Sequence, residues 1–144
     1  RSVAMSRYVV DASVAVKWFV PEVHSEAAHR LLDNSHELLA PDLLLPEFGN
    51  ILWKKVRLNE INQREGRQII RALTTVPLEL YPSINLLEPA FDIADGTKRS
   101  VYDSLYLALA VLHDCRMVTA DRRFYSALTG GAFARNLRWV EDEL

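Results

Sequence analysis

The stretch RYVVDASVAVKW, residues 7–18, indicates the fold class. Its first part, Tyr8 to Val10, is aromatic and β-branched, which is typical of a buried strand. Residues 13–19 follow as a short predicted helix, which Pro21 stops. Asp11 separates the two elements, where it could cap the helix, pair with a buried cation or hold a metal ion. The stretch alone leaves all three roles open.

The rest of the chain continues this alternation of strand and helix. Short apolar runs predict strands at residues 37–40, 78–80, 116–120 and 138–140. Helices are predicted over residues 22–32, 42–58, 62–75, 84–95, 101–114 and 122–128, with Asp42 as an N-cap and Gly96 ending the helix at 84–95. This order favours a parallel sheet with helices on both faces.

The composition is that of an ordinary globular domain. The 144 residues suit one core, 49% of them are hydrophobic, and the net charge of −2 gives no overall basic signature for nucleic acid. A single cysteine, Cys115, excludes an internal disulfide and favours a reducing, cytoplasmic setting. No apolar stretch is long enough for a bilayer, so no membrane partner is expected. We place the domain at residues 6–144, with Met5 as the native start and residues 1–4 as an expression remnant.

Four acidic residues are candidates for a functional site, although a structural role could explain each of them. Asp11 and Asp121 both follow a predicted strand and could cap the next helix. Ser100 and Asp103 match the capping box at the start of the most apolar helix. Glu47 lies one turn into the helix at 42–58, where it shares a face with Asn50 and Lys54 and could belong to a solvated polar stripe.

The joint placement of these acids favours a metal site. Ligands of parallel α/β sheets bind at the carboxyl ends of the strands, where all four carboxylates can converge. Four carboxylates in one cleft repel each other and need compensating cations. Oxygen ligands without clustered His or Cys select Mg²⁺ or Mn²⁺, and such sites commonly act on phosphates.

Four segments together resemble the PIN-domain family, specifically the VapC-type toxins of toxin–antitoxin pairs. They are VVDASVAVKWFVPE, APDLLLPEFGNILWK, VYDSLYLALA and MVTADRRF, and the resemblance covers about residues 8–140. It implies an α/β fold, a three-layer α/β/α sandwich with a central, mostly parallel sheet of four to five strands. It also implies a metal-dependent endoribonuclease that cleaves RNA, a cognate antitoxin protein as partner, a homodimer, and a larger assembly with the antitoxin.

The resemblance also implies roles for individual residues. The catalytic and metal-binding quartet falls on Asp11, Glu47, Asp103 and Asp121, with Asp121 either contacting the ion or lying just outside its ligands. Supporting polar residues fall on Ser13, Asn50 and Thr119. In the implied mechanism, one or two Mg²⁺ (or Mn²⁺) ions lower the pKa of a bound water, which attacks phosphorus and leaves a 3′-hydroxyl and a 5′-phosphate.

Basic residues for the RNA backbone are expected at two places. Arg64, Arg67 and Arg71 recur at i, i+3 and i+7, so they share one helical face, which is either a solvated face or an RNA-binding arm. Lys17, Arg122 and Arg123 lie near members of the quartet and are the preferred phosphate contacts. The aromatic residues Trp18, Phe19, Phe48 and Trp53 are expected in the core or at a partner interface.

Three other functions compete with this interpretation. A receiver-like phosphoacceptor module would need an adjacent pair of acids after the first strand, whereas the segment VVDAS contains a single acid. A catalytically silent PIN-like binding module would not need the complete quartet. A DNA-flap nuclease would usually need a longer chain than 144 residues.

Overall fold

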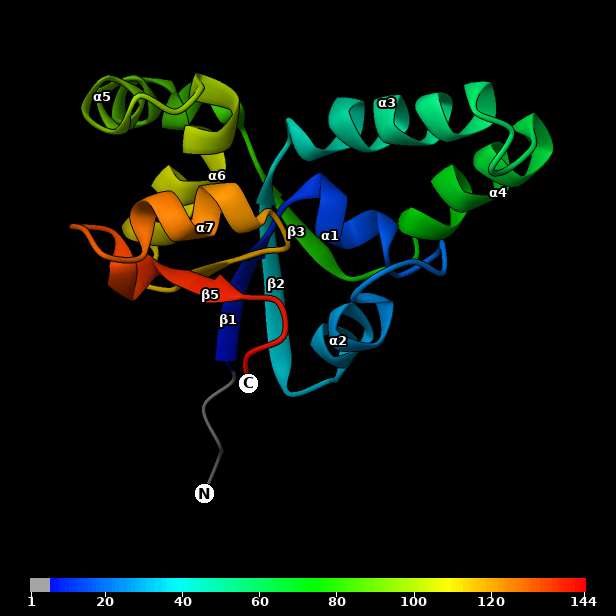
Figure 1. The fold of residues 1–144 in the computed structure, drawn as a ribbon, viewed down its shortest axis with the longest axis horizontal. Coiled ribbons are helices and arrows are strands. Elements are labelled where there is room, and N and C mark those ends of the chain that lie inside the picture. The colour runs from blue at the N-terminus through cyan, green and yellow to red at the C-terminus, as the bar shows by residue number, and fades with distance from the viewer. Residues whose placement is uncertain (1–5) are drawn as a thin grey trace.

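A computed structural model describes residues 6–144, so the expectations for residues 1–4 and Met5 lie outside the described residues (Figure 1). Its centre is a five-stranded sheet in the order β3-β2-β1-β4-β5, and every pairing is parallel. The strands are β1 Ser6–Val10, β2 His36–Pro41, β3 Leu78–Tyr81, β4 Arg116–Thr119 and β5 Leu137–Trp139. The prediction of a parallel sheet of four to five strands is confirmed.

Helices cover both faces of this sheet. They are α1 Ala12–Val16, α2 Ser25–His29, α3 Leu44–Arg57, α4 Gln63–Leu73, α5 Leu87–Thr97, α6 Val101–Leu112 and α7 Arg122–Leu128, with 3₁₀ turns η1 Arg30–Leu32, η2 Ser83–Leu86 and η3 Ala134–Asn136. Helices α1 to α4 lie on one side in Figure 1, and α5, α6 and α7 lie on the other. The predicted three-layer α/β/α sandwich is therefore confirmed.

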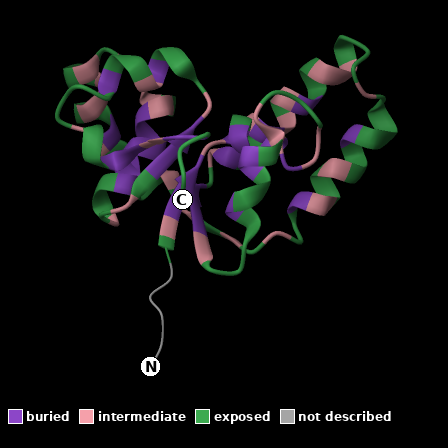
Figure 2. Ribbon diagram, turned by 60° about the horizontal axis from the view of Figure 1, so that its bottom comes forward, coloured by how far each residue is buried: buried purple, intermediate pink, exposed green. Residues whose placement is uncertain are grey.

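The core explains why the strands read as continuous apolar runs. Tyr8, Val9 and Val10 of β1 are all buried, because β1 lies between two neighbours and is covered on both faces. In α6, every residue from Ser104 to Ala110 is buried, since this helix packs against both the sheet and α5. The buried segments gather in the interior of the molecule, and exposed segments surround them (Figure 2). Within residues 6–144, no helix combines the length and the apolar character needed to cross a bilayer.

Two predicted helix boundaries are wrong. Asp42 is not an N-cap of α3, because its carboxylate accepts hydrogen bonds from the backbone N–H and the hydroxyl of Ser83, at 3.0 and 2.6 Å. Gly96 does not end α5: the helix continues to Thr97, whose hydroxyl donates to the Ile93 carbonyl at 2.8 Å. Lys98, with a φ of 62°, takes the left-handed position instead.

The predicted helix over residues 22–32 divides in the structure. His24 has a φ of 69°, so α2 begins only at Ser25, and the chain tightens into η1 after His29. Of the four aromatic residues expected in the core or at a partner interface, Trp18 and Phe48 are buried and Phe19 packs against the core, whereas Trp53 is 55% exposed. Trp53 therefore lies outside the core.

Candidate active site

The four predicted acids line one hollow at the carboxyl edge of the sheet. The hollow has a volume of about 270 Å³. Its lining comes from α1, α3, α6 and the turn after β4, and consists of Asp11, Ala12, Ser13, Glu47, Asn50, Ile51, Lys54, Asp103, Tyr106 and Asp121. Because β1 and β4 are neighbours in the sheet, Asp11 and Asp121 stand at the ends of adjacent strands.

Asp11 both caps a helix and faces the hollow. Its Oδ1 accepts hydrogen bonds from the Val14 N–H and the Ser13 hydroxyl, each at 2.9 Å, which leaves Oδ2 for other partners. Burial raises the pKa of Asp11 to about 6. The two hydrogen bonds lower this pKa, and the negative charges of Glu47 and Asp103 raise it further. The carboxylate is therefore fixed in place but poorly compensated in its charged form.

Asp103 takes part in only half of the predicted capping box. The Ser100 hydroxyl accepts from the Asp103 N–H at 3.0 Å, but no reciprocal bond from the Asp103 carboxylate is found in the described chain. Helix α4, by contrast, has both bonds, between Asn62 and Glu65. The Asp103 carboxylate thus remains free to face the hollow, and burial, followed by the charge of Asp121, raises its pKa.

Asp121 stands at the exposed side of the hollow. Its Oδ1 accepts from the Phe124 N–H at 3.1 Å, which caps α7, and its own N–H donates to the Thr119 hydroxyl at 3.0 Å. Thr119 is completely buried and does not line the hollow. It orients the turn that carries Asp121, whereas Ser13 binds the Asp11 carboxylate itself.

Glu47 projects from the first turn of α3 and is bound by a residue that the sequence analysis missed. The Tyr106 hydroxyl donates a hydrogen bond to Glu47 Oε1 at 2.5 Å. Asn50 and Lys54 line the hollow beside Glu47, so the predicted polar face of this helix is confirmed. Asp103 and Tyr106 are i and i+3 on one helix, but this spacing alone does not identify the partner of the hydroxyl.

The predicted phosphate contacts are not all available. Lys17 forms an ion pair with Glu22 at 3.1 Å and its side chain is 12% exposed, so its charge is already paired within the protein. Arg122 stacks on Trp139, with its guanidinium carbon 3.8 Å from the ring centroid. Arg123, at the start of α7, is exposed. Helix α4 also exposes Arg64, Arg67 and Arg71. Lys54 also lines the hollow, and Arg99, close to Asp103, is a cation that the sequence analysis missed.

The donor set of this hollow fits a hard divalent cation. The four acids and the Asn50 amide offer oxygen donors, and the raised pKa values of Asp11 and Asp103 show a need for positive charge. As they stand, no three Asp, Glu, His or Cys side chains within residues 6–144 form a ready-made ligand group. An ion held by one or two carboxylates and several waters is how Mg²⁺ is commonly bound.

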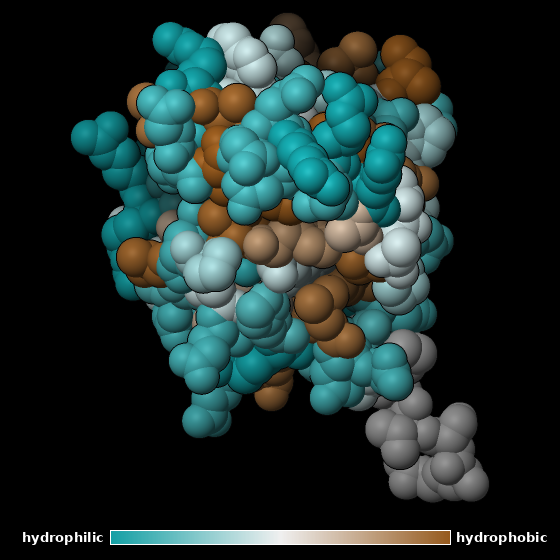
Figure 3. Space-filling model, turned by 90° about the vertical axis from the view of Figure 1, so that its right-hand side faces the viewer, coloured by the Kyte–Doolittle hydropathy of each residue, from teal (hydrophilic) through white to brown (hydrophobic). Residues whose placement is uncertain are grey.

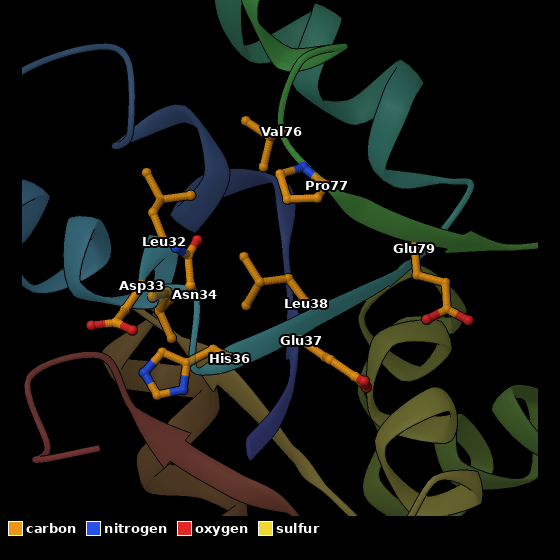
Figure 4. A pocket seen from close by; sticks show the side chains of 10 residues that line it. Leu32, Asp33, Asn34, His36, Glu37, Leu38, Val76, Pro77 and Glu79 are labelled. Carbon is orange, nitrogen blue, oxygen red and sulfur yellow. The ribbon is translucent and has the colours of Figure 1, made fainter. Parts of the chain in front are cut away.

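A second hollow lies near the other end of β2, and its acids are engaged locally. It lies between η1, β2 and the start of β3 (Figure 4). Asp33 accepts from the Ser35 N–H at 2.8 Å, and Glu79 accepts from the Tyr81 hydroxyl at 2.6 Å. Glu37 pairs with Arg7 at 3.6 Å. This hollow therefore lacks the convergent free carboxylates of the first.

The raised pKa of Asp11 predicts a pH dependence of stability. Between its ordinary value of 3.8 and about 6, the folded state binds a proton at Asp11 more readily than the unfolded state does. The resulting stabilisation is complete below the lower value and is lost as the pH rises through about 6. In EDTA, the melting temperature of wild type should therefore fall relative to Asp11→Asn between pH 5 and pH 7.5. If the difference in melting temperature between the two proteins stays constant from pH 5 to pH 7.5, the raised pKa of Asp11 is contradicted.

Comparisons with known proteins agree with this geometry. The PIN domain family matches residues 8–127 of the chain. Ribonuclease VapC3 of Pyrobaculum aerophilum is 33% identical over 119 residues, which are 81% of this chain and 91% of that protein.

Solved structures share the fold at lower identity. PAE2754 from Pyrobaculum aerophilum has a TM-score of 0.68 at 24% identity and covers 94% of this chain and 85% of its own. VapBC2 from Rickettsia felis, bound to a DNA fragment from its promoter, has a TM-score of 0.57 at 13% identity. The match covers 92% of this chain and 96% of the VapBC2 chain.

Proposed function

Because the chain belongs to the PIN-domain family and has close relatives among the VapC ribonucleases, we propose that it is an endoribonuclease which uses Mg²⁺ or Mn²⁺ to hydrolyse RNA. It acts in the cytoplasm as the toxin of a toxin–antitoxin pair. The observation that carries the proposal is the convergence of four acids from separate parts of the chain on one hollow.

The residues of the hollow divide the work. Asp11, Glu47 and Asp103 would hold the ion, with Asp121 at the exposed side. When bound, the ion supplies a water of lowered pKa and stabilises negative charge on the phosphate oxygens. The Val14 N–H and the Ser13 hydroxyl hold the Asp11 carboxylate in place through Oδ1. The orientation of the free oxygen, Oδ2, is therefore fixed before the ion binds. Lys54 adds a positive charge beside the acids that can attract an RNA phosphate.

Purified protein incubated with separate tRNA, rRNA and mRNA pools, with either Mg²⁺ or EDTA, tests this function. We expect cleavage with Mg²⁺ alone, and products with a 3′-hydroxyl and a 5′-phosphate. Cleavage that persists in EDTA, or products that end in a 2′,3′-cyclic phosphate, would contradict it, because attack by the ribose 2′-hydroxyl needs no activated water.

Helix α4 offers a basic surface for the RNA backbone. Arg64, Arg67 and Arg71 are exposed on it. If all three contact phosphates, replacing them with Ala should weaken RNA binding and reduce the salt slope of log K by about 2, since each contact to a single strand contributes ~0.7. Fluorescence anisotropy with labelled RNA at several salt concentrations measures both quantities. Arg135→Ala is the control, because it removes a cation that is paired with Asp114 at 2.8 Å. An equal salt slope in wild type, the triple variant and Arg135→Ala would exclude α4 as an RNA-binding arm.

Two apolar surfaces suit the protein partners. A groove between α3, α4 and β3, with a volume of about 480 Å³, is lined by apolar residues that include Leu45, Ile70 and Leu80, which are exposed. The side of the molecule that carries α3 and α4 shows separate hydrophobic patches among hydrophilic side chains (Figure 3). We assign the groove to an antitoxin segment, and the exposed Leu87 and Phe91 of α5 to a homodimer contact.

A further inference from the structure

Tyr106 connects the parts of the chain that carry three of the four acids. It lies on α6 one turn after Asp103, it is 2% exposed, and it lines the acidic hollow. Its hydroxyl donates to Glu47 Oε1 at 2.5 Å, and the other neighbour of that hydroxyl is the backbone N–H of Ala12, directly after Asp11. One buried hydroxyl of α6 therefore reaches the first turns of α1 and α3.

The bond to Glu47 has a clear physical value. A glutamate has a flexible side chain, and no cation pairs with Glu47 among the ion pairs of the described chain. A hydrogen bond from a hydroxyl to a carboxylate is short and strong, and the buried ring of Tyr106 cannot move without disturbing the core. Tyr106 thus fixes the position of Oε1 and leaves Oε2 free.

We propose that Tyr106 is a positioning residue, which holds Glu47 so that Oε2 faces the divalent ion. The inference rests on the proposed function, because it takes Glu47 as a ligand. Tyr106 acts through Glu47 and does not touch the reacting atoms. Carboxylates that bind metals are themselves held by hydrogen bonds, and loss of such a partner costs about 10–100-fold in metal affinity or activity.

Tyr106→Phe tests the role because it removes the hydroxyl and keeps the ring. We expect its dissociation constant for Mn²⁺, measured by titration calorimetry, to rise about 10-fold. Its far-UV circular dichroism should match wild type. Tyr102→Phe is the matched control, since Tyr102 lies on the same helix, is 62% exposed, and should leave Mn²⁺ affinity unchanged.

A double-mutant cycle separates positioning from general support of the fold. In a Glu47→Gln background the ligand is already lost, so adding Tyr106→Phe should change Mn²⁺ affinity less than about 2-fold. An equal loss in both backgrounds, or wild-type affinity in Tyr106→Phe, would overturn the inference. If wild type binds no Mn²⁺, or if Asp11→Asn binds it as well as wild type does, the proposed function itself fails.

Discussion

Asp11→Asn should lower the rate of Mg²⁺-dependent RNA cleavage by more than about 100-fold, because even partners that only orient a ligand are worth 10–100-fold. Asn keeps the side-chain oxygen that accepts from the Val14 N–H and the Ser13 hydroxyl, so α1 retains its cap. What the variant loses is the negative charge toward the ion. Initial rates on a labelled RNA at saturating Mg²⁺ measure the effect.

The same variant should be more stable than wild type when metal is absent. Removing a buried charge whose pKa is raised from 3.8 to about 6 should add up to about 3 kcal/mol to the free energy of unfolding at pH 7.5 in EDTA. Asp114→Asn is the control, because that exposed acid pairs with Arg135 away from the hollow. A large fall in the melting temperature of Asp11→Asn would instead make capping the main role of this residue.

Phe48→Ala should lower the free energy of unfolding by about 3–5 kcal/mol, the usual cost of a large cavity in a packed core. Phe48 is 1% exposed and packs edge-to-face on Phe19, with ring centroids 6.1 Å apart. It follows Glu47 directly, so it anchors the turn of α3 that carries this acid. Urea denaturation measures the loss.

Leu45→Ala is the control for this variant. Leu45 lies in the first turn of the same helix but is 46% exposed, so its truncation should cost less than about 1 kcal/mol. Similar losses in both variants would mean that Phe48 is not a specific anchor of α3.

The convergence of the acids followed from the sequence because the order of elements constrains it strongly. Asp11 and Asp121 each come directly after a buried apolar run, and parallel strands end at the same edge of a sheet. The choice between cap and ligand did not follow from spacing. Asp11 and Asp121 do cap their helices through Oδ1, and both still line the hollow. A carboxylate has two oxygens, so the two roles are compatible.

The misses share a physical cause: side-chain contacts that the period of a helix or strand does not report. Tyr106 lies in a helix that is apolar nearly all round, where a tyrosine is indistinguishable from core until its hydroxyl partner is known. Asp42 meets Ser83, 41 residues away, instead of its own helix. Lys17 meets Glu22, which also binds Lys55 at 2.8 Å, and no local pattern reports that pairing.

Anomalous scattering from a crystal soaked in Mn²⁺ tests the central claim most directly. The four acids are proposed to hold a divalent ion in the hollow at the carboxyl edge of the sheet. We expect an anomalous peak within bonding distance of at least one carboxylate oxygen of Asp11, Glu47 or Asp103, and no such peak in Asp11→Asn. A hollow without a peak, or a peak that is unchanged in the variant, would contradict the account.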